Sequence, residues 1–360
     1  MQSLKTLTKI AGWSVFAIAM VVYYFSAERT GSLWDCGEFI LGAYKMQIVH
    51  PPGAPLFILV GRMFTWVADL FSDNPANIAF AVNLMSSVCT AFAAMFVCWS
   101  TIIFGKLSLF GRDSEIEPTR GESIALAASG LVAGLATAFC TSIWFSAVEG
   151  EVYAMSTFFT TLTFWAMLKW YSLPDTPKND RWIILAIYAI GLSLGVHLLS
   201  LLVLPAMGLM YYFKKYKEHN FIGGAIAFGI GAALVILIQK IIIVGIPSIW
   251  KSFDIFLVNN VGLPFHSGLI PTFLLVCAAL FIGLRYSKVK GNSVLQMITV
   301  GTLMLIVGYS TFGMVVIRAN ANPPINMNDP SDATRLLPYL NRGPFNNSLS
   351  PYCSLFKYGN

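Results

Sequence analysis

The sequence has little charge. Asp, Glu, Lys and Arg make up 11% of its 360 residues, whereas a soluble globular domain carries about 25%. Hydrophobic residues make up 56% of the chain. This composition excludes an ordinary soluble domain, and successive apolar runs of about 17 residues or more indicate transmembrane helices.

Paired cysteines are also missing. The six cysteines form no CxxC pair, and four of them lie within apolar runs, where a thiol behaves as a small hydrophobic group. The sequence therefore predicts neither a zinc site nor a disulfide framework. The net charge of +6 comes from Lys and Arg in short loops, which is a signal of membrane topology. No nucleic-acid partner and no metal site are predicted.

The apolar runs predict an all-α polytopic membrane protein with about nine transmembrane helices. One further run, residues 55–71, follows Pro51-Pro52-Gly53 and contains Arg62 and Asp69. It is only ~25 Å long as a helix, so we interpret it as a re-entrant or juxtamembrane helix. Residues 182–213 are too long for one span and are divided near His197. The first apolar run is either a signal peptide cleaved near Ser26-Ala27 or an uncleaved anchor, and we favour the anchor. The expected spans then cover residues 10–25, 76–104, 123–145, 153–171, 182–196, 197–213, 221–244, 269–284 and 294–317.

The positive-inside rule sets the orientation. With these spans, the loops rich in Lys and Arg all face the cytoplasm, as does the N-terminus. The transmembrane domain covers residues 1–317 and has a long first external loop, residues 26–75. Residues 318–360 form an exported C-terminal tail.

Several polar side chains are then expected on the outer face. Asp35 and Glu38 are three residues apart, so on a short helix they share one face, beside Trp34 at the interface. Such carboxylates are either solvated loop residues, a general base for an attacking hydroxyl, or ligands of a divalent cation.

Other candidates are spread along the chain. His50 precedes the stiff Pro-Pro-Gly turn and could face a phosphate at the next helix N-terminus. His197, at membrane depth between two helices, is a functional candidate or a hydrogen-bonded structural histidine. Glu149 and Glu151 lie in a short turn, either solvated or in contact with an acceptor or a sugar. Arg318, after the last span, is an interfacial anchor or a phosphate ligand.

The long external loop with its acidic motif, followed by "HPPGAPLF", resembles the GT-C glycosyltransferases. More specifically, "WDCGEFILGAYKMQIVHPPGAPLF", "GLSLGVHLLSLLVLPA" and "RANANPPINMNDPSDATRLL" are similar to the transmembrane-protein-260-like family, also called domain of unknown function 2723. The resemblance covers roughly residues 13–339. It implies a GT-C-like helix bundle in the inner membrane of a bacterium, with an extracytoplasmic active site.

The resemblance further implies the transfer of a hexose, mannose, from a polyprenyl-phosphate sugar to Ser or Thr hydroxyls of exported proteins. Asp35 would be the catalytic base and Glu38 its support. His50, His197 and Arg318 would bind the donor phosphate, and Glu149, Glu151 and Trp34 would contact acceptor or sugar. No cofactor is expected beyond the lipid-linked donor. A divalent metal is compatible with this mechanism but is not predicted.

Alternatives to this function also stay open. The acceptor could be a glycan or a lipid, or the protein could be a secondary transporter, although no inverted repeat is found. Members of the family continue into a large C-terminal region, so the tail is expected to be truncated, and an inactive fragment is a third interpretation.

Overall fold

The computed structural model describes residues 4–71, 74–113 and 116–342. Within these ranges every regular element is a helix, and one isolated bridge pairs Ile48 with Asn326. Seven helical segments are long and apolar enough to cross a membrane. The prediction of an all-α, multi-pass membrane protein is therefore confirmed. These segments are Leu4–Ser26, Pro75–Phe110, Arg120–Ala138, Leu198–Lys215, Phe221–Val261, Leu269–Val289 and Ser293–Asn320.

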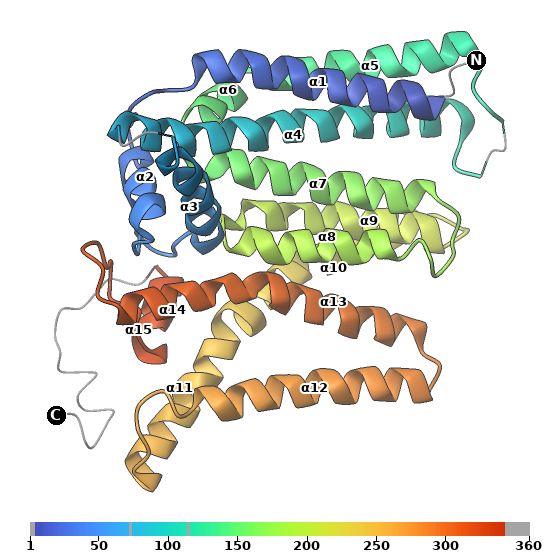
Figure 1. Ribbon diagram of the computed structural model, residues 1–360. Coiled ribbons are helices and arrows are strands. Elements are labelled where there is room, and N and C mark those ends of the chain that lie inside the picture. Colours follow the sequence, from blue (N-terminus) through green and yellow to red (C-terminus); the bar gives the residue numbers. More distant parts are fainter. Residues whose placement is uncertain (1–3, 72–73, 114–115, 343–360) are drawn as a thin grey trace.

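Two further helices run along the same bundle (Figure 1). Helix α7, Val152–Ser172, carries several Ser and Thr residues among its apolar ones, and helix α8, Arg181–Leu194, has only 14 residues. Their polarity and length explain why they fall outside the seven. With them, the described chain has a helix at each of the nine expected spans.

Helix α4, Pro75–Phe110, is the centre of the N-terminal half. It packs against α1 (Leu4–Ser26), α5 (Arg120–Ala138) and α7, and its buried residues are mostly small, including Ala91, Ala93 and Ala94. Small residues let helix backbones approach closely in a membrane, where van der Waals packing drives association.

The C-terminal half joins this bundle through α8 and α13, Ser293–Tyr309. Gly191 of α8 faces Gly308 of α13, and a Cβ placed on Gly191 would lie 2.6 Å from the carbonyl oxygen of Leu305. This approach is open only to glycine, because any side chain would collide with the facing backbone. The contact fixes one side of the helix that leads into the His197 junction.

The break near His197 was predicted and is confirmed. Helix α8 ends at Leu194, a short 3-10 helix η1 covers Leu198–Val203, and α9 continues over Leu204–Lys215. Pro205 sits in the first turn of α9, where its missing N–H leaves no bond unmade.

Two expected spans differ from the structure. Residues 123–145 are not one helix, because α5 ends at Ala138 and a separate helix, α6 (Thr141–Val148), begins after an extended Cys140. The span predicted at 221–244 continues to Val261 through α10, η2, α11 and η3. Pro247 in the first turn of α11 lacks an N–H, and the wider π-helix before it accommodates the change. The bounds are Phe221–Leu237, Ile238–Gly245, Ile246–Phe256 and Leu257–Val261.

Helices α2, Cys36–Lys45, and α3, Pro55–Asp69, lie across one end of the bundle instead of along it (Figure 1). This agrees with the juxtamembrane interpretation of residues 55–71. Met63, Trp66 and Leu70 lie on one exposed apolar face of the α3 segment, a pattern typical of a helix resting in the membrane interface.

The same end holds α14, Gly313–Asn320, and α15, Ala333–Leu340. Although residues from 318 onwards were expected to form a tail, α15 contributes Leu336 and Tyr339 to the hydrophobic core. The remaining elements are the 3-10 turn η4, Ser310–Phe312, and α12, Leu269–Val289.

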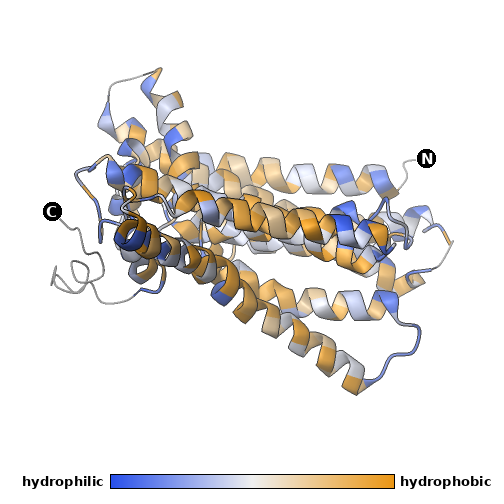
Figure 2. Ribbon diagram, turned by 90° about the horizontal axis from the view of Figure 1, so that it is seen from below, coloured by the Kyte–Doolittle hydropathy of each residue, from blue (hydrophilic) through white to orange (hydrophobic). Residues whose placement is uncertain are grey.

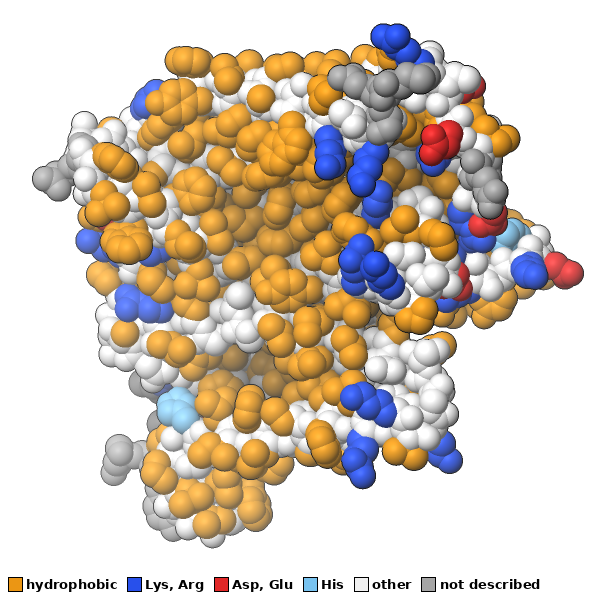
Figure 3. Space-filling view, turned by 45° about the vertical axis from the view of Figure 1, so that its right-hand side comes forward, with side chains coloured by type: hydrophobic (Ala, Val, Ile, Leu, Met, Phe, Trp, Pro, Cys, Tyr) orange, Lys and Arg blue, Asp and Glu red, His pale blue; other side chains and the backbone are white. Residues whose placement is uncertain are grey.

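The start of α1 and the α4–α5, α7–α8 and α12–α13 connections lie at the opposite end of the bundle (Figure 1), and these connections carry many of the Lys and Arg residues. Hydrophilic residues gather at the ends of the helices (Figure 2). Along the flank in Figure 3, hydrophobic side chains form a broad face, and many of the visible Lys and Arg lie toward that basic end. Helix α12 and the α10–η3 segment bury only 6% of their most apolar windows, as expected of helices that face lipid. Residues 26–71 and 318–342 thus share the end away from most of the basic loops.

Candidate functional site

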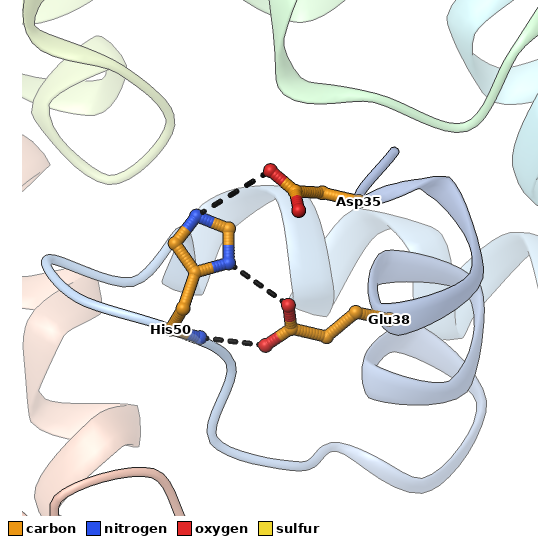
Figure 4. A group of neighbouring side chains, drawn as sticks. All are labelled: Asp35, Glu38 and His50. Carbon is orange, nitrogen blue, oxygen red and sulfur yellow. Dashed lines mark hydrogen bonds and ion pairs between the residues drawn. The ribbon is translucent and has the colours of Figure 1, made fainter. Parts of the chain in front are cut away.

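Asp35, Glu38 and His50 form a three-residue cluster at this end (Figure 4). Asp35 is the N-cap of α2, and Glu38 lies in its first turn, where a carboxylate is stabilised by the helix dipole. Glu38 binds His50 twice: one carboxylate oxygen accepts the backbone N–H at 2.7 Å, and the other lies 2.9 Å from Nδ1. The second ring nitrogen, Nε2, lies 3.8 Å from Asp35 Oδ2.

The two carboxylates differ in what they can do. Glu38 is 21% exposed and has both oxygens committed to His50, whereas the side chain of Asp35 is 57% exposed. With Nδ1–H donated to Glu38, Nε2 of a neutral imidazole carries no proton, so it can accept one from Asp35 after that carboxylate has been protonated. Asp35 and His50 Nε2 are therefore the groups available for proton transfer, and Glu38 orients the ring.

The cluster borders a cavity of about 190 Å³. Its walls come from α2, the turn after His50, the start of α7, the junction before η1, and the residue that follows the α15 segment. The polar side chains that line the cavity include Asp35, His50, Glu151, Tyr153, His197 and Arg342. Five segments distant in sequence thus build one small polar site.

Glu149 and Glu151, the two acids of the α6–α7 turn, have different surroundings. Ser32 donates its hydroxyl to Glu149 at 2.9 Å, which connects this turn to the segment between α1 and α2. Glu151 lines the cavity. Burial, and then the nearby Asp35 and Glu149 carboxylates, raise the pKa of Glu151 above its ordinary value.

His197 also lines the cavity. Its Nδ1 accepts the backbone N–H of Leu199 at 3.2 Å, and its ring centre lies 5.5 Å from that of Tyr153. Burial, and then the charge of Arg342, lower the pKa of His197. The imidazole is therefore neutral near pH 7, and it offers Nε2–H to a ligand without adding positive charge.

Arg342 supplies a permanent cation that sequence reasoning missed. It lines the cavity beside His197, and its guanidinium makes no hydrogen bond or ion pair with any residue that the structure describes. Nothing in the local sequence distinguishes it from other surface arginines. Only the packing of α15 brings it to the site.

Four expected site residues do not line this cavity: Glu38 is bonded to His50, Glu149 lies near Glu151, and the other two are Arg318 and Trp34. Arg318 donates to the carbonyl oxygens of Met46 at 2.8 Å and Lys45 at 3.2 Å, so its guanidinium caps the C-terminus of α2. Trp34 is 91% exposed and does not line the cavity. The remaining predicted residues converge on or next to one place.

The cluster also has the composition of a metal site. Asp35, Glu38 and His50 each offer one ligand atom, and these three atoms lie within 4.8 Å of one another. A divalent cation could be held between Asp35 and His50 Nε2, while Glu38 keeps its bond to Nδ1 and orients the ring. The same arrangement also fits a hydrogen-bonded proton relay.

Residues 35–220, just over half of the chain, match the sequence model of the "Protein O-mannosyl-transferase TMEM260 N-terminal domain". The chain is 24% identical over 168 residues to "Protein O-mannosyl-transferase tmem260" of Dictyostelium discoideum, covering 47% of this chain and 18% of the relative. It is also 24% identical over 207 residues to "Protein O-mannosyl-transferase TMEM260" of Mus musculus, covering 57% and 26%.

The chain thus spans about a fifth to a quarter of the length of these relatives. No solved structure matches it significantly. The matched region contains Asp35, Glu38, His50, Glu151 and His197, whereas Arg342 lies beyond it. Because the match covers more than half of the chain, the protein belongs to the TMEM260 N-terminal domain family.

Proposed function

We propose that this protein transfers a hexose, mannose, from a polyprenyl-phosphate sugar to Ser or Thr hydroxyls of exported proteins. The observation that carries the proposal is the cavity in which Asp35 and His50 face His197 and Arg342. Membership of a family whose curated relatives are named protein O-mannosyl-transferases supports the choice of reaction.

The cavity has two chemically different walls. On one side, Asp35 is the base that accepts the proton of the acceptor hydroxyl. The hydroxyl oxygen then forms a bond to the anomeric carbon while the bond from that carbon to the phosphate oxygen breaks, so the configuration inverts. Glu38 holds His50 in place, and the His50 ring in turn faces Asp35.

On the other side, the leaving lipid phosphate gains negative charge. Arg342 is the permanent cation at that wall, and neutral His197 can donate an N–H. Donors that are already in place when charge develops stabilise the transition state most effectively. We assign the donor phosphate to Arg342 and His197, and we leave Arg318, which caps α2, out of the phosphate site.

The position of the cavity supports an extracytoplasmic reaction. Residues at the start of α2 and in the turn after it line the cavity, and these segments lie at the end of the bundle away from the α4–α5, α7–α8 and α12–α13 connections. The positive-inside rule assigns those Lys- and Arg-rich connections to the cytoplasm. A lipid-linked donor in the outer leaflet would then reach the cavity from the side, above the interfacial helix α3.

The test is transfer of radiolabelled mannose from polyprenyl-phosphate mannose to a Ser/Thr-rich exported acceptor, in membranes containing wild type, Asp35→Asn or Asp113→Asn. We expect Asp35→Asn to lower transfer by about 100-fold or more. Asp113 is paired with Arg112 outside the cavity, in a loop after α4, so its variant is the matched control. Equal transfer by Asp35→Asn and wild type would remove Asp35 from the mechanism.

A negative result with wild type has a defined follow-up. The chain covers only part of its relatives, so we would repeat the assay with other polyprenyl-linked hexoses and with the C-terminal region of a relative added. Transfer restored by another donor corrects the sugar, and transfer restored by the added region shows that the acceptor is bound there. No transfer under any of these conditions would refute the proposal.

A further inference from the structure

The loop that carries His50 is held from behind by the far end of the chain. We propose that residues 318–340, called here the C-terminal clamp, position His50 in the cavity, with Tyr339 and Arg318 as the positioning residues. The clamp lies outside the part of the chain that matches the family. Three contacts along the loop and the internal bonds of the clamp support this inference.

The first contact fixes the end of α2. Met46, its C-cap, is in a left-handed conformation with φ of 50°, which turns the chain sharply out of the helix. Arg318 donates Nε–H to the carbonyl oxygen of Met46 at 2.8 Å and a second N–H to that of Lys45 at 3.2 Å. The guanidinium therefore satisfies two carbonyls that the ended helix leaves open.

The second contact is a short piece of parallel pairing. Ile48 donates its backbone N–H to Ile325 at 3.0 Å and accepts the N–H of Met327 at 3.2 Å. The side chain of Ile48 is 2% exposed and belongs to the same core as Leu336. Both the backbone and the side chain of Ile48 are thus bound to the clamp.

The third contact lies directly beside His50. Tyr339 is completely buried and donates its hydroxyl to the carbonyl oxygen of Val49 at 2.6 Å. The same hydroxyl also packs closely against Gly53, because a Cβ added to this glycine would overlap the hydroxyl oxygen. Tyr339 thus touches the chain on both sides of the His50 turn, which is itself closed by the bond from Gly53 N–H to His50 O at 2.9 Å.

The clamp is itself rigidly held. Asp332 caps α15 by accepting the backbone N–H groups of Thr334 at 2.7 Å and Arg335 at 3.0 Å. Arg335 also pairs with Asp329, and the Asn326 side chain donates to Asp329 at 3.1 Å. A segment with this many internal bonds can hold the loop in one position.

The consequence concerns the direction of the His50 ring. With residues 45, 46, 48 and 49 all bound to the clamp, His50 is presented to Glu38 and Asp35 in one arrangement. Removing the Tyr339 hydroxyl leaves a buried carbonyl unpaired, so we expect the turn to loosen while the aromatic ring keeps the core filled. Only the effect on transfer rests on the proposed function.

The experiment compares Tyr339→Phe with Tyr309→Phe. Tyr309 is also buried and also donates its hydroxyl to a backbone carbonyl, that of Ile243 at 3.0 Å, but it does not line the cavity. The readout is the rate of modification of each histidine by diethylpyrocarbonate, followed by mass spectrometry of the purified full chain. The chain has four histidines, and His219, near the basic loops, is the internal reference.

We expect His50 to react about three- to tenfold faster in Tyr339→Phe than in wild type, the range of one lost hydrogen bond. Arg318→Gln should shift His50 in the same direction, and His219 should keep its rate in every variant. In the mannose assay, Tyr339→Phe should lower kcat while Tyr309→Phe leaves it unchanged. The two phenylalanine variants should have similar melting temperatures.

The results separate the two proposals. Faster His50 modification without any mannose transfer by wild type would support the clamp and count against the proposed reaction. If wild type transfers mannose, and His50 in Tyr339→Phe and Arg318→Gln is modified at the same rate as in wild type and Tyr309→Phe, the proposed role of the clamp is wrong. The proposed reaction would then still stand.

Discussion

Glu38 binds both the backbone and the ring of His50, with one carboxylate oxygen 2.7 Å from the amide nitrogen and the other 2.9 Å from Nδ1. A carboxylate can accept from both groups at once, whereas an amide offers only one acceptor oxygen. Glu38 therefore selects the tautomer of His50 that carries its proton on Nδ1. This tautomer leaves Nε2 open toward Asp35.

Glu38→Gln should disturb this selection. The new amide nitrogen would face Nδ1 as a donor and favour the opposite tautomer, so we expect transfer to fall by about 10- to 100-fold, the range for a lost bond to a charged group. The measurement is kcat and KM for mannose transfer. Glu117→Gln, at an exposed position near the basic end, is the control, and a Glu38→Gln enzyme with wild-type kcat would contradict the relay.

Arg342→Gln should weaken donor binding. The guanidinium is the only permanent cation among the described residues that line the cavity, so its loss should raise the KM for the polyprenyl-phosphate donor by about tenfold or more. His197→Gln should have a smaller effect on KM, because burial and Arg342 keep that imidazole neutral. Equal donor KM values for Arg342→Gln and wild type would place the phosphate elsewhere.

Glu151→Gln should make the protein more stable at neutral pH. The folded state raises the pKa of Glu151, so the folded protein binds more protons than the unfolded chain, and stability falls as the pH rises from about 4.5. The glutamine variant does not have this penalty. We expect its melting temperature in detergent to exceed that of wild type at pH 7, and the difference to shrink toward pH 4. A constant difference from pH 4 to pH 8 would show that the charge of Glu151 is not the cause.

Chelation should leave transfer nearly unchanged. In the proposed reaction Asp35 acts as the base, with His50 Nε2 beside it, so no step needs a cation. We expect transfer in EDTA to stay within about twofold of the untreated protein. A loss of transfer that Mn²⁺ or Mg²⁺ restores would instead mean that Asp35 and His50 Nε2 hold a cation while Glu38 orients the ring.

Local patterns in the sequence were sufficient for most of the helices. The length of residues 182–213, the Gly and Pro residues within them and the positive-inside rule predicted the break near His197, and Pro-Pro-Gly predicted the start of the helix at residue 55; both are confirmed. The break after Ala138 was missed because Phe139 and Cys140 carry no turn signal. The π-helical continuation beyond residue 244 was missed because Gly245 and Pro247 are residues that usually mark the end of a helix.

The candidate site was only partly accessible from the sequence. Asp35 and Glu38 could be paired by helix spacing, but their bond to His50 depends on how a ten-residue helix is followed by a turn. Arg342 and Tyr339 were out of reach, because no local pattern shows which loop a distant helix will pack against. The charge of Arg318 led to the prediction of an interfacial anchor or a phosphate ligand. Only the fold shows that its guanidinium instead donates to the backbone carbonyls of Met46 and Lys45.

The bond between Tyr339 and Val49 joins residues that are 290 positions apart. A ribosome adding 5 to 20 residues per second needs about 15 to 60 s to cover that distance. During this time the loop that carries His50 exists without Tyr339. The bond that holds this loop from behind therefore forms only after about 290 further residues have been added to the chain.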